Sequence, residues 1–173
     1  PRSTRVPDAT RFRSVKSKLA GDASILPGPV SLYRDDVYVG QSQLSLLRPG
    51  EEHDFAFGVD DKVSVQHNVL KDEKKEAGLI SKDNVVERAS VTALQNFHEQ
   101  PVAIVLKQVV PTTKNEKVHV TVDKDVTSPD YATDADNVKG LLEWDFTMAS
   151  KEKKEIKLDW QVSWPSDYSV SGL

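Results

Sequence analysis

The chain has 173 residues, of which 38% are hydrophobic and 29% are charged, a composition typical of a soluble globular protein. No apolar run is long enough to cross a membrane as a helix, and no signal peptide is visible. The chain contains no cysteine, which excludes disulfides, thiolate nucleophiles and cysteine-ligated zinc.

The net charge of −4 is unevenly distributed. Residues 1–20 contain six Arg or Lys and one Asp, so this segment carries +5 and the remainder carries −9. Because a body of that sign repels phosphate backbones, we expect no nucleic-acid binding. The basic start could dock on an acidic surface or a membrane, but a solvated terminal segment is the favoured interpretation.

The chain opens on Pro1 rather than Met, and we therefore expect a fragment or a processed product of a longer protein. No Asn-x-Ser/Thr acceptor occurs, which slightly favours a cytoplasmic location.

Two prolines and a hairpin dominate the first third of the chain. Residues 1–10 read as an extended lead, and alternation predicts a strand over residues 12–19. Leu26, Pro27, Gly28 and Pro29 then predict a rigid bend. Residues 30–34 and 37–46 predict a hairpin with a two-residue turn at Asp35 and Asp36, since Asp tolerates positive φ. Its inward face is expected to contain Val30, Leu32, Val37 and Val39, and Gly40 closes the stretch.

Two further strands and a charged connection follow. A turn over residues 48–51 leads into a strand with His53, Phe55 and Phe57 on one face. Strict alternation predicts a half-buried strand over residues 63–69. Residues 71–84 are highly charged and predict either an exposed hairpin tip or, in the first half, a helical turn.

The middle of the chain predicts a second hairpin. A long strand over residues 85–97 is expected to turn at residues 98–100 into a strand over residues 101–110. The second strand is apolar on both faces and is expected in the middle of a sandwich. A short strand over residues 118–122 and a long acidic loop over residues 124–140 come next.

The C-terminal pair has the clearest alternation. Leu142, Trp144, Phe146 and Met148 share one face of the first strand. A charged turn over residues 149–155 predicts a hairpin into a second strand, whose inward residues are Ile156, Leu158, Trp160, Val162 and Trp164. All three tryptophans therefore point inward, and each buries roughly 200 Å². About nine strands with turn signals between them predict one antiparallel β-sandwich over residues 11–173, with little or no helix.

Several ordered motifs resemble one protein family. They read LPGPVSLYRDDVYVG over residues 26–40, RPGEE over 48–52, GVDDK over 58–62, PTTKNE over 111–116 and KGLLEW over 139–144. These motifs resemble the C-terminal domain of unknown function of mucoidy inhibitor A-like proteins. The resemblance implies an all-β domain that follows an N-terminal β-domain and a coiled coil, and it supplies no catalytic residues.

Two kinds of metal site can be drawn from the sequence. His53, His67 and His119 lie in or beside predicted strands and could converge on a metal, but unrelated strand histidines are the favoured interpretation. The acidic pairs could bind calcium, although the full calcium-loop signature is missing and solvated loops are favoured. These pairs are Asp60 with Asp61, Asp123 with Asp125, and Asp134 with Asp136.

Glu143 and Asp145 share an outward strand face, about 7 Å apart by strand geometry. Such a pair could serve a glycosidase, but we expect a cross-strand ion pair with Lys157 instead. No Gly-x-Ser-x-Gly elbow and no phosphate-binding glycine loop occur.

These observations predict a non-enzymatic β-sandwich that acts as an interaction or assembly module, with a protein partner or self-association and no cofactor. The contact surface is expected at an exposed strand edge or at the two long loops. Residues 26–29, 35, 36 and 40 and the three tryptophans are expected to be structural, so that replacing Gly28 or Pro29 lowers stability. The alternative is a carbohydrate-binding module or β-sandwich hydrolase, which requires exposed, coplanar tryptophans with Tyr33 or Tyr38 beside them.

Overall fold

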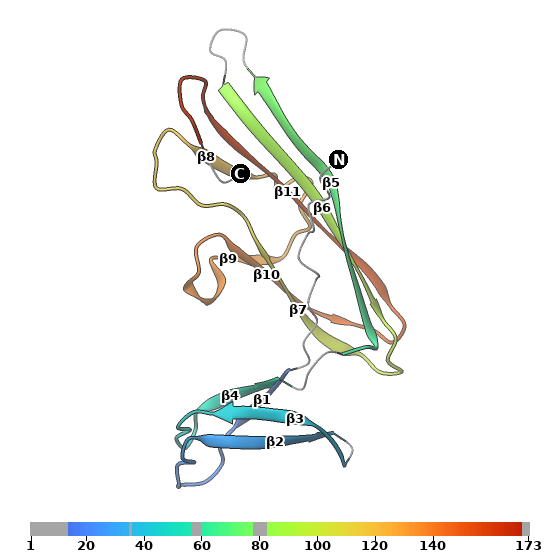
Figure 1. Cartoon of the computed structure of the whole chain (residues 1–173). Helices are drawn as coiled ribbons and strands as arrows, with labels where there is room; N and C mark the ends of the chain where they lie inside the picture. The colour runs from blue at the N-terminus through green and yellow to red at the C-terminus, as the bar shows by residue number, and fades with distance from the viewer. Residues whose placement is uncertain (1–13, 35, 57–59, 78–82, 171–173) are drawn as a thin grey trace. The chain divides into compact units, whose positions relative to one another are not determined.

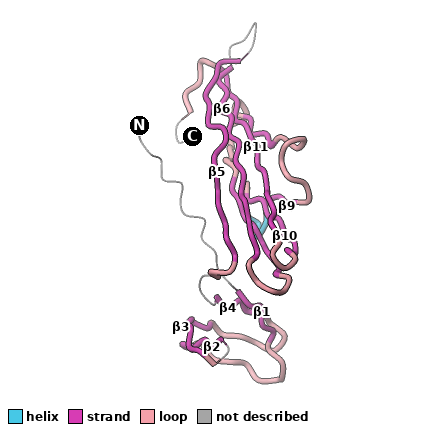
Figure 2. The backbone as a smooth tube through the Cα atoms, turned by 90° about the vertical axis from the view of Figure 1, so that its right-hand side faces the viewer, coloured by secondary structure: helices cyan, strands magenta, loops and turns pink. Residues whose placement is uncertain are grey.

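The computed structural model describes residues 14–34, 36–56, 60–77 and 83–170. Nearly all regular structure in them is antiparallel strand, which confirms the all-β fold class (Figures 1 and 2). No helix among these residues is long and apolar enough to span a membrane. The sequence predicted one domain over residues 11–173, whereas the chain forms two compact units, Pro1–Asp61 and Lys62–Leu173. The expected lead over residues 1–10 lies outside the described residues.

The first unit contains two small antiparallel sheets. Strand β1 (Ser14–Lys18) pairs with β4 (Glu52–Ala56), and β2 (Gly28–Arg34) pairs with β3 (Val37–Leu44). A bridge between Ile25 and Leu47, with N···O distances of 2.9 and 3.1 Å, ties the segments that flank the hairpin. The buried apolar residues of this unit are Leu32, Leu44 and Leu47.

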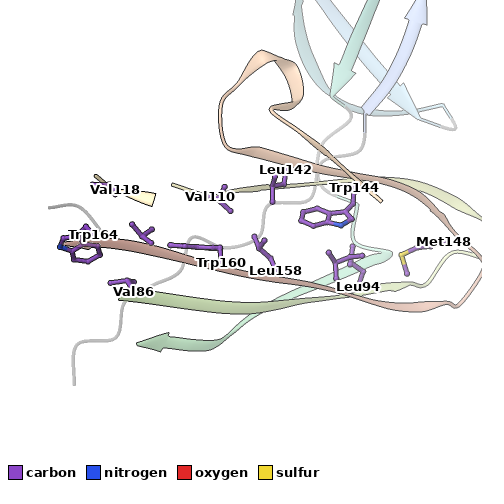
Figure 3. Packing of buried hydrophobic residues seen from close by; sticks show 12 residues of the cluster. Val86, Leu94, Val110, Val118, Leu142, Trp144, Met148, Leu158, Trp160 and Trp164 are labelled. Atoms are coloured by element: carbon purple, nitrogen blue, oxygen red, sulfur yellow. The ribbon is translucent and has the colours of Figure 1, made fainter. Parts of the chain in front are cut away.

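The second unit contains two larger antiparallel sheets. Strands β5 (Val63–Ala77), β6 (Asp83–Asn96), β11 (Lys153–Pro165) and β8 (His119–Val122) form one sheet in that spatial order. Strands β7 (Val102–Val109), β10 (Leu141–Met148) and β9 (Tyr131–Thr133) form the other, and a short 3-10 turn, η1 (Ala135–Asn137), follows β9. Their apolar faces share one core that extends from Val118 and Trp164 at one end to Met148 at the other (Figure 3).

The inward faces of β10 and β11 carry the bulk of this core, as the alternation predicts. The three tryptophans and Met148 are buried. The Trp144 indole N–H donates to the Ser128 carbonyl at 3.0 Å, and the Trp164 indole N–H donates to the Tyr168 carbonyl at 3.1 Å. Both indoles therefore bury their ring area while satisfying their polar atom.

Two predicted hairpins are wrong. Strand β10 pairs with β7 and β9, and β11 pairs with β6 and β8, so β10 and β11 face each other from different sheets. Likewise, β6 and β7 do not pair, and residues 98–100 carry the chain from one sheet to the other. The physical reason is that β11 fills the position beside β6 along its whole length, from Lys153 opposite Gln95 to Pro165 opposite Asp83.

Three other expectations change in the second unit. Strand β7 lies at a sheet edge rather than in the middle of a sandwich, because β10 is its one neighbour among the strands that the structure describes. The charged residues 71–77 continue β5 as strand, so the helical turn is wrong, and the connection over residues 78–82 lies outside the described residues. The acidic loop over residues 124–140 contains β9 and η1.

A fully buried asparagine joins two turns of the second unit. The Asn96 side-chain amide donates to the carbonyls of Gln100, Met148 and Ala149 at 3.1, 3.4 and 2.9 Å. Its side-chain oxygen accepts the His98 backbone N–H at 2.9 Å. Because a buried amide is costly unless it is hydrogen-bonded, these contacts fix the turn after β6 against the turn after β10.

A glycine of the KGLLEW motif has a steric role. Gly140 has a φ of 78°, and a Cβ built on it would lie 2.5 Å from the Val110 carbonyl oxygen and 2.6 Å from a Thr112 methyl group. The Gly140 N–H donates to Asp134 Oδ1 at 2.8 Å, and its carbonyl accepts the Val110 N–H at 2.9 Å. This position therefore requires glycine both for its backbone angle and for close approach.

We expect Gly140→Ala to lower the free energy of unfolding by about 2–4 kcal/mol, because left-handed strain and overpacking act together. Asn137→Ala is the matched control, since Asn137 also has a positive φ of 59° but is exposed. That control should lose only about 1 kcal/mol. Urea unfolding followed by tryptophan fluorescence measures both, and equal losses would contradict the steric role of Gly140.

Candidate functional site

The strand histidines of the second unit lie apart. The His67 Nδ1 on β5 is 3.0 Å from the Thr92 hydroxyl oxygen, while His119 begins β8, two strands beyond β6. Three strand spacings separate β5 from β8, which corresponds to about 14 Å. In the first unit, the His53 ring contacts Phe55 edge to face at 4.7 Å. Among the described residues, no group of three or more His, Asp or Glu side chains could hold a metal ion.

Two of the three acidic pairs proposed for calcium support turns and ion pairs. Asp123 Oδ1 accepts the Asp125 N–H at 2.9 Å, which closes a tight turn. Asp134 accepts the Gly140 N–H, and Asp136 contacts Lys107 at 2.5 Å. These carboxylates therefore already serve the fold of their loops.

The expected ion pair of Glu143 with Lys157 is wrong. Lys157 lies on β11 in the other sheet, whereas Lys107 on β7 stands directly opposite Glu143 and its Nζ is 3.2 Å from the carboxylate. A hydrogen bond to Asp136, and to a lesser extent one to Glu143, raises the pKa of Lys107. Glu143 is thus one half of a cross-strand ion pair, as expected, but with a different lysine.

One polar hollow of about 570 Å³ lies on the outer face of the four-stranded sheet. Ala89 on β6 stands between Lys71 on β5 and Asp159 on β11. The hollow forms there because the alanine methyl group is too small to fill the space between the two longer side chains. Its lining residues are Lys71, Glu87, Thr121, Val122, Asp123, Lys124, Asp159 and Gln161.

Two carboxylates that line the hollow, Glu87 and Asp159, differ in electrostatic environment. Glu87 forms ion pairs with Lys71 and with Lys75, the latter at 2.8 Å, and these hydrogen bonds lower the pKa of Glu87. Burial, and secondarily the nearby Asp123, raises the pKa of Asp159. Lys71, one of the two lysines that line the hollow, is thus already paired with Glu87, so these two residues form an ionic surface patch rather than a set of free reactive groups.

The hairpin of the first unit presents aromatic side chains to solvent. Arg34 stands opposite Val37, and Asp36 has a φ of 64°, which agrees with the predicted two-residue turn; Asp35 lies outside the described residues. Tyr33, Val37 and Tyr38 are 61%, 64% and 53% exposed. The two tyrosine rings meet edge to face, with centroids 5.7 Å apart. We call these three residues the hairpin patch.

The expected inward face of this hairpin is only partly correct. Leu32 is buried, but Val37 points to solvent. The physical reason is a register irregularity between Leu32 and Tyr33, which interrupts the alternation on which the expectation depended.

The motif over residues 26–40, which we call the family stretch, contains five other residues that the sequence predicts to be structural. Leu26 is 76% exposed, Pro27 lies in a bend, and Gly28 and Pro29 already belong to β2, opposite Leu44 and Gln43. A Cβ on Gly28 would meet open space, so the structure offers no steric reason for a loss of stability on its replacement. Gly40, in contrast, has a φ of 148°, which favours glycine.

The aromatic residues do not form the platform that a sugar-binding site requires. Trp144, Trp160 and Trp164 are buried, and the Tyr33 and Tyr38 rings are inclined by 68° rather than coplanar. The condition set for the carbohydrate alternative is therefore not met by these residues.

Sequence patterns missed the buried polar residues. Asn96 and Thr92 lie at inward positions of β6, and Thr92 contacts both His67 and Gln108. Alternation marks the face on which such residues lie, but no local signal distinguishes a bonded buried amide from a solvated one.

The two carboxylates of the hollow should have opposite effects on stability. The folded chain raises the pKa of Asp159, so the native state binds more protons than the unfolded state and loses stability as pH rises. Asp159→Asn should therefore stabilise the protein at about pH 7, with the gain vanishing towards about pH 3. Because the pKa of Glu87 is lowered, its contribution is present above the unfolded value and is lost as pH falls.

Glu87→Gln is accordingly the matched variant, expected to destabilise at about pH 7 and to approach the parent at about pH 3. Urea titrations at both pH values measure the two effects. Shifts of the same sign at neutral pH would refute the assignment of opposite environments.

Comparison with known proteins identifies a family. The family model described as "Domain of unknown function (DUF4139)" matches residues 2–166. Protein F37C4.5 of Caenorhabditis elegans is 19% identical over 113 residues, which are 65% of this chain and 20% of that protein. The chain thus spans about a fifth of the length of this curated relative. No solved structure matches the chain significantly. Since the match covers nearly the whole sequence, the chain belongs to the DUF4139 family of unknown function.

Proposed function

We propose that this chain is a non-enzymatic interaction module that binds a protein partner through the hairpin patch. The observation that carries the proposal is the exposure of Tyr33 and Tyr38, which stand opposite each other near the tip of β2 and β3, with the exposed Val37 next to Tyr38 in the chain. Aromatic side chains with a polar tip are enriched at protein interfaces, where they supply large contact areas at low entropic cost.

The geometry of the hairpin supports this role. The edge-to-face contact of the tyrosine rings restrains both side chains before a partner arrives. The two-residue turn and the paired strands fix the backbone beneath them. A pre-ordered surface loses less conformational entropy on binding, which favours affinity.

The surroundings of the charged residues support a non-catalytic role. Glu87 is held by lysines, Glu143 and Asp136 by Lys107, and the tryptophans are committed to the core. Catalytic carboxylates, in contrast, need access to a substrate and pKa values matched to proton transfer.

We infer further that the chain is the C-terminal part of a mucoidy inhibitor A-like protein. The ordered motifs over residues 26–40 and 139–144 support this origin. The steric contacts at Gly140 explain why the second motif has a glycine at this position. The greater length of the nematode relative is consistent with additional upstream domains.

Site-specific photo-crosslinking tests the binding role. A benzophenone amino acid placed at Tyr38 in the full-length protein, inside its own cells, should yield a discrete cross-linked band that Tyr33→Ser weakens. Val126, which is 49% exposed in the second unit, is the control position and should yield no such band. The same products from both positions would count against the hairpin patch as the contact surface.

Tyr33→Ser should leave the melting temperature within about 1–2 °C of the parent, because its side chain is largely exposed. A large drop would instead assign the tyrosine a structural role.

A further inference from the structure

Within the described part of the second unit, one edge of the apolar strand β7 pairs with no other strand. Its eight residues, VAIVLKQV, pair with β10 on one side and end the three-stranded sheet on the other. An edge strand presents unpaired N–H and C=O groups that can hydrogen-bond a further strand. Pro101 and Pro111 flank the strand, so an added strand is confined to the segment between them.

The other sheet edges of the second unit have features that discourage pairing with a further strand. Strand β5 carries the charged run KDEKKE over residues 71–76, which discourages edge-to-edge pairing. Strands β8 and β9 contain only four and three residues. Among the described edges of this unit, β7 therefore combines length with apolar character.

The outward side chains of β7 also include no unpaired charge that would repel a second strand. Val105 and Val109 on the outward face are 53% and 68% exposed. Lys107 lies between them, but its ammonium group is engaged by Asp136 at 2.5 Å and by Glu143 at 3.2 Å. Because this lysine is paired within its own sheet, a second copy of β7 does not meet an unpaired ammonium group at this edge.

We propose that β7 pairs with β7 of a second copy of this chain, antiparallel about a two-fold axis at Val105. This register places Val105 opposite Val105 of the second copy and Lys107 opposite Ala103 of the second copy. The result is one continuous sheet of six strands, and the interface is isologous, as two-fold dimers require. The inference goes beyond the proposed partner-binding role, because it uses a different surface in a different unit.

Disulfide trapping tests the register directly, because the chain contains no cysteine. Opposite residues of an antiparallel pair have Cα atoms about 4.5–5.5 Å apart, within reach of a disulfide. Val105→Cys should give a covalent dimer under mild oxidation. Val69→Cys, on the charge-guarded edge strand β5 and 49% exposed, is the matched control and should remain monomeric. Equal cross-linking of both variants would overturn the proposal.

Sedimentation equilibrium of the cysteine-free chain supplies the second readout. The parent should show a concentration-dependent dimer, and Val105→Lys should weaken association at least tenfold while keeping its melting temperature. Val126→Lys is the control and should associate like the parent. A parent chain that remains monomeric at about 200 µM, where even weak specific contacts are populated, would refute the proposal.

The Tyr33→Ser variant should dimerise normally. Loss of dimerisation on this substitution would show that the hairpin patch forms the dimer contact, and it would overturn the assignment to β7.

Discussion

The burial of β10 against β11 is the constraint on which the rest of the second unit depends. Each strand alternates large apolar residues with polar ones, so each has one face that must leave water. Placing the strands in different sheets lets both faces bury each other. Ser128 then links the sheets, because its carbonyl accepts the Trp144 indole N–H of β10 and its N–H donates to the Lys157 carbonyl of β11. Three buried indoles account for roughly 600 Å² of this surface, or about 15 kcal/mol of favourable transfer free energy before entropy is subtracted.

This arrangement also determines which surfaces remain available. Because β11 occupies the position beside β6, β7 pairs with β10 alone and becomes a sheet edge. The same strand β11 supplies Asp159 to the outer hollow, where Asp123 and Glu87 surround it. The edge of β7 that is proposed for self-association is therefore a consequence of the pairing order rather than of any single motif.

The sequence predicted strand positions and inward faces far better than strand neighbours. Alternation in residues 142–148 and 156–164 identified the buried face correctly, yet the proximity of the two segments in the chain suggested a hairpin. Which strand lies next to β11 is decided by its long match to β6, a non-local property that no window reveals. In the first unit, the irregularity after Leu32 had a similar effect, because it placed Val37, expected on the inward face, at the surface.

Hydroxyl-radical footprinting read by mass spectrometry tests the central claim most directly, namely that the tryptophans form the scaffold and the family stretch forms the surface. The account predicts rapid oxidation of Tyr33 and Tyr38 and strong protection of Trp144, Trp160 and Trp164 in the folded chain. Because tryptophan is intrinsically more reactive than tyrosine, composition alone would give the opposite order. Protected tyrosines together with rapidly oxidised tryptophans would contradict the account.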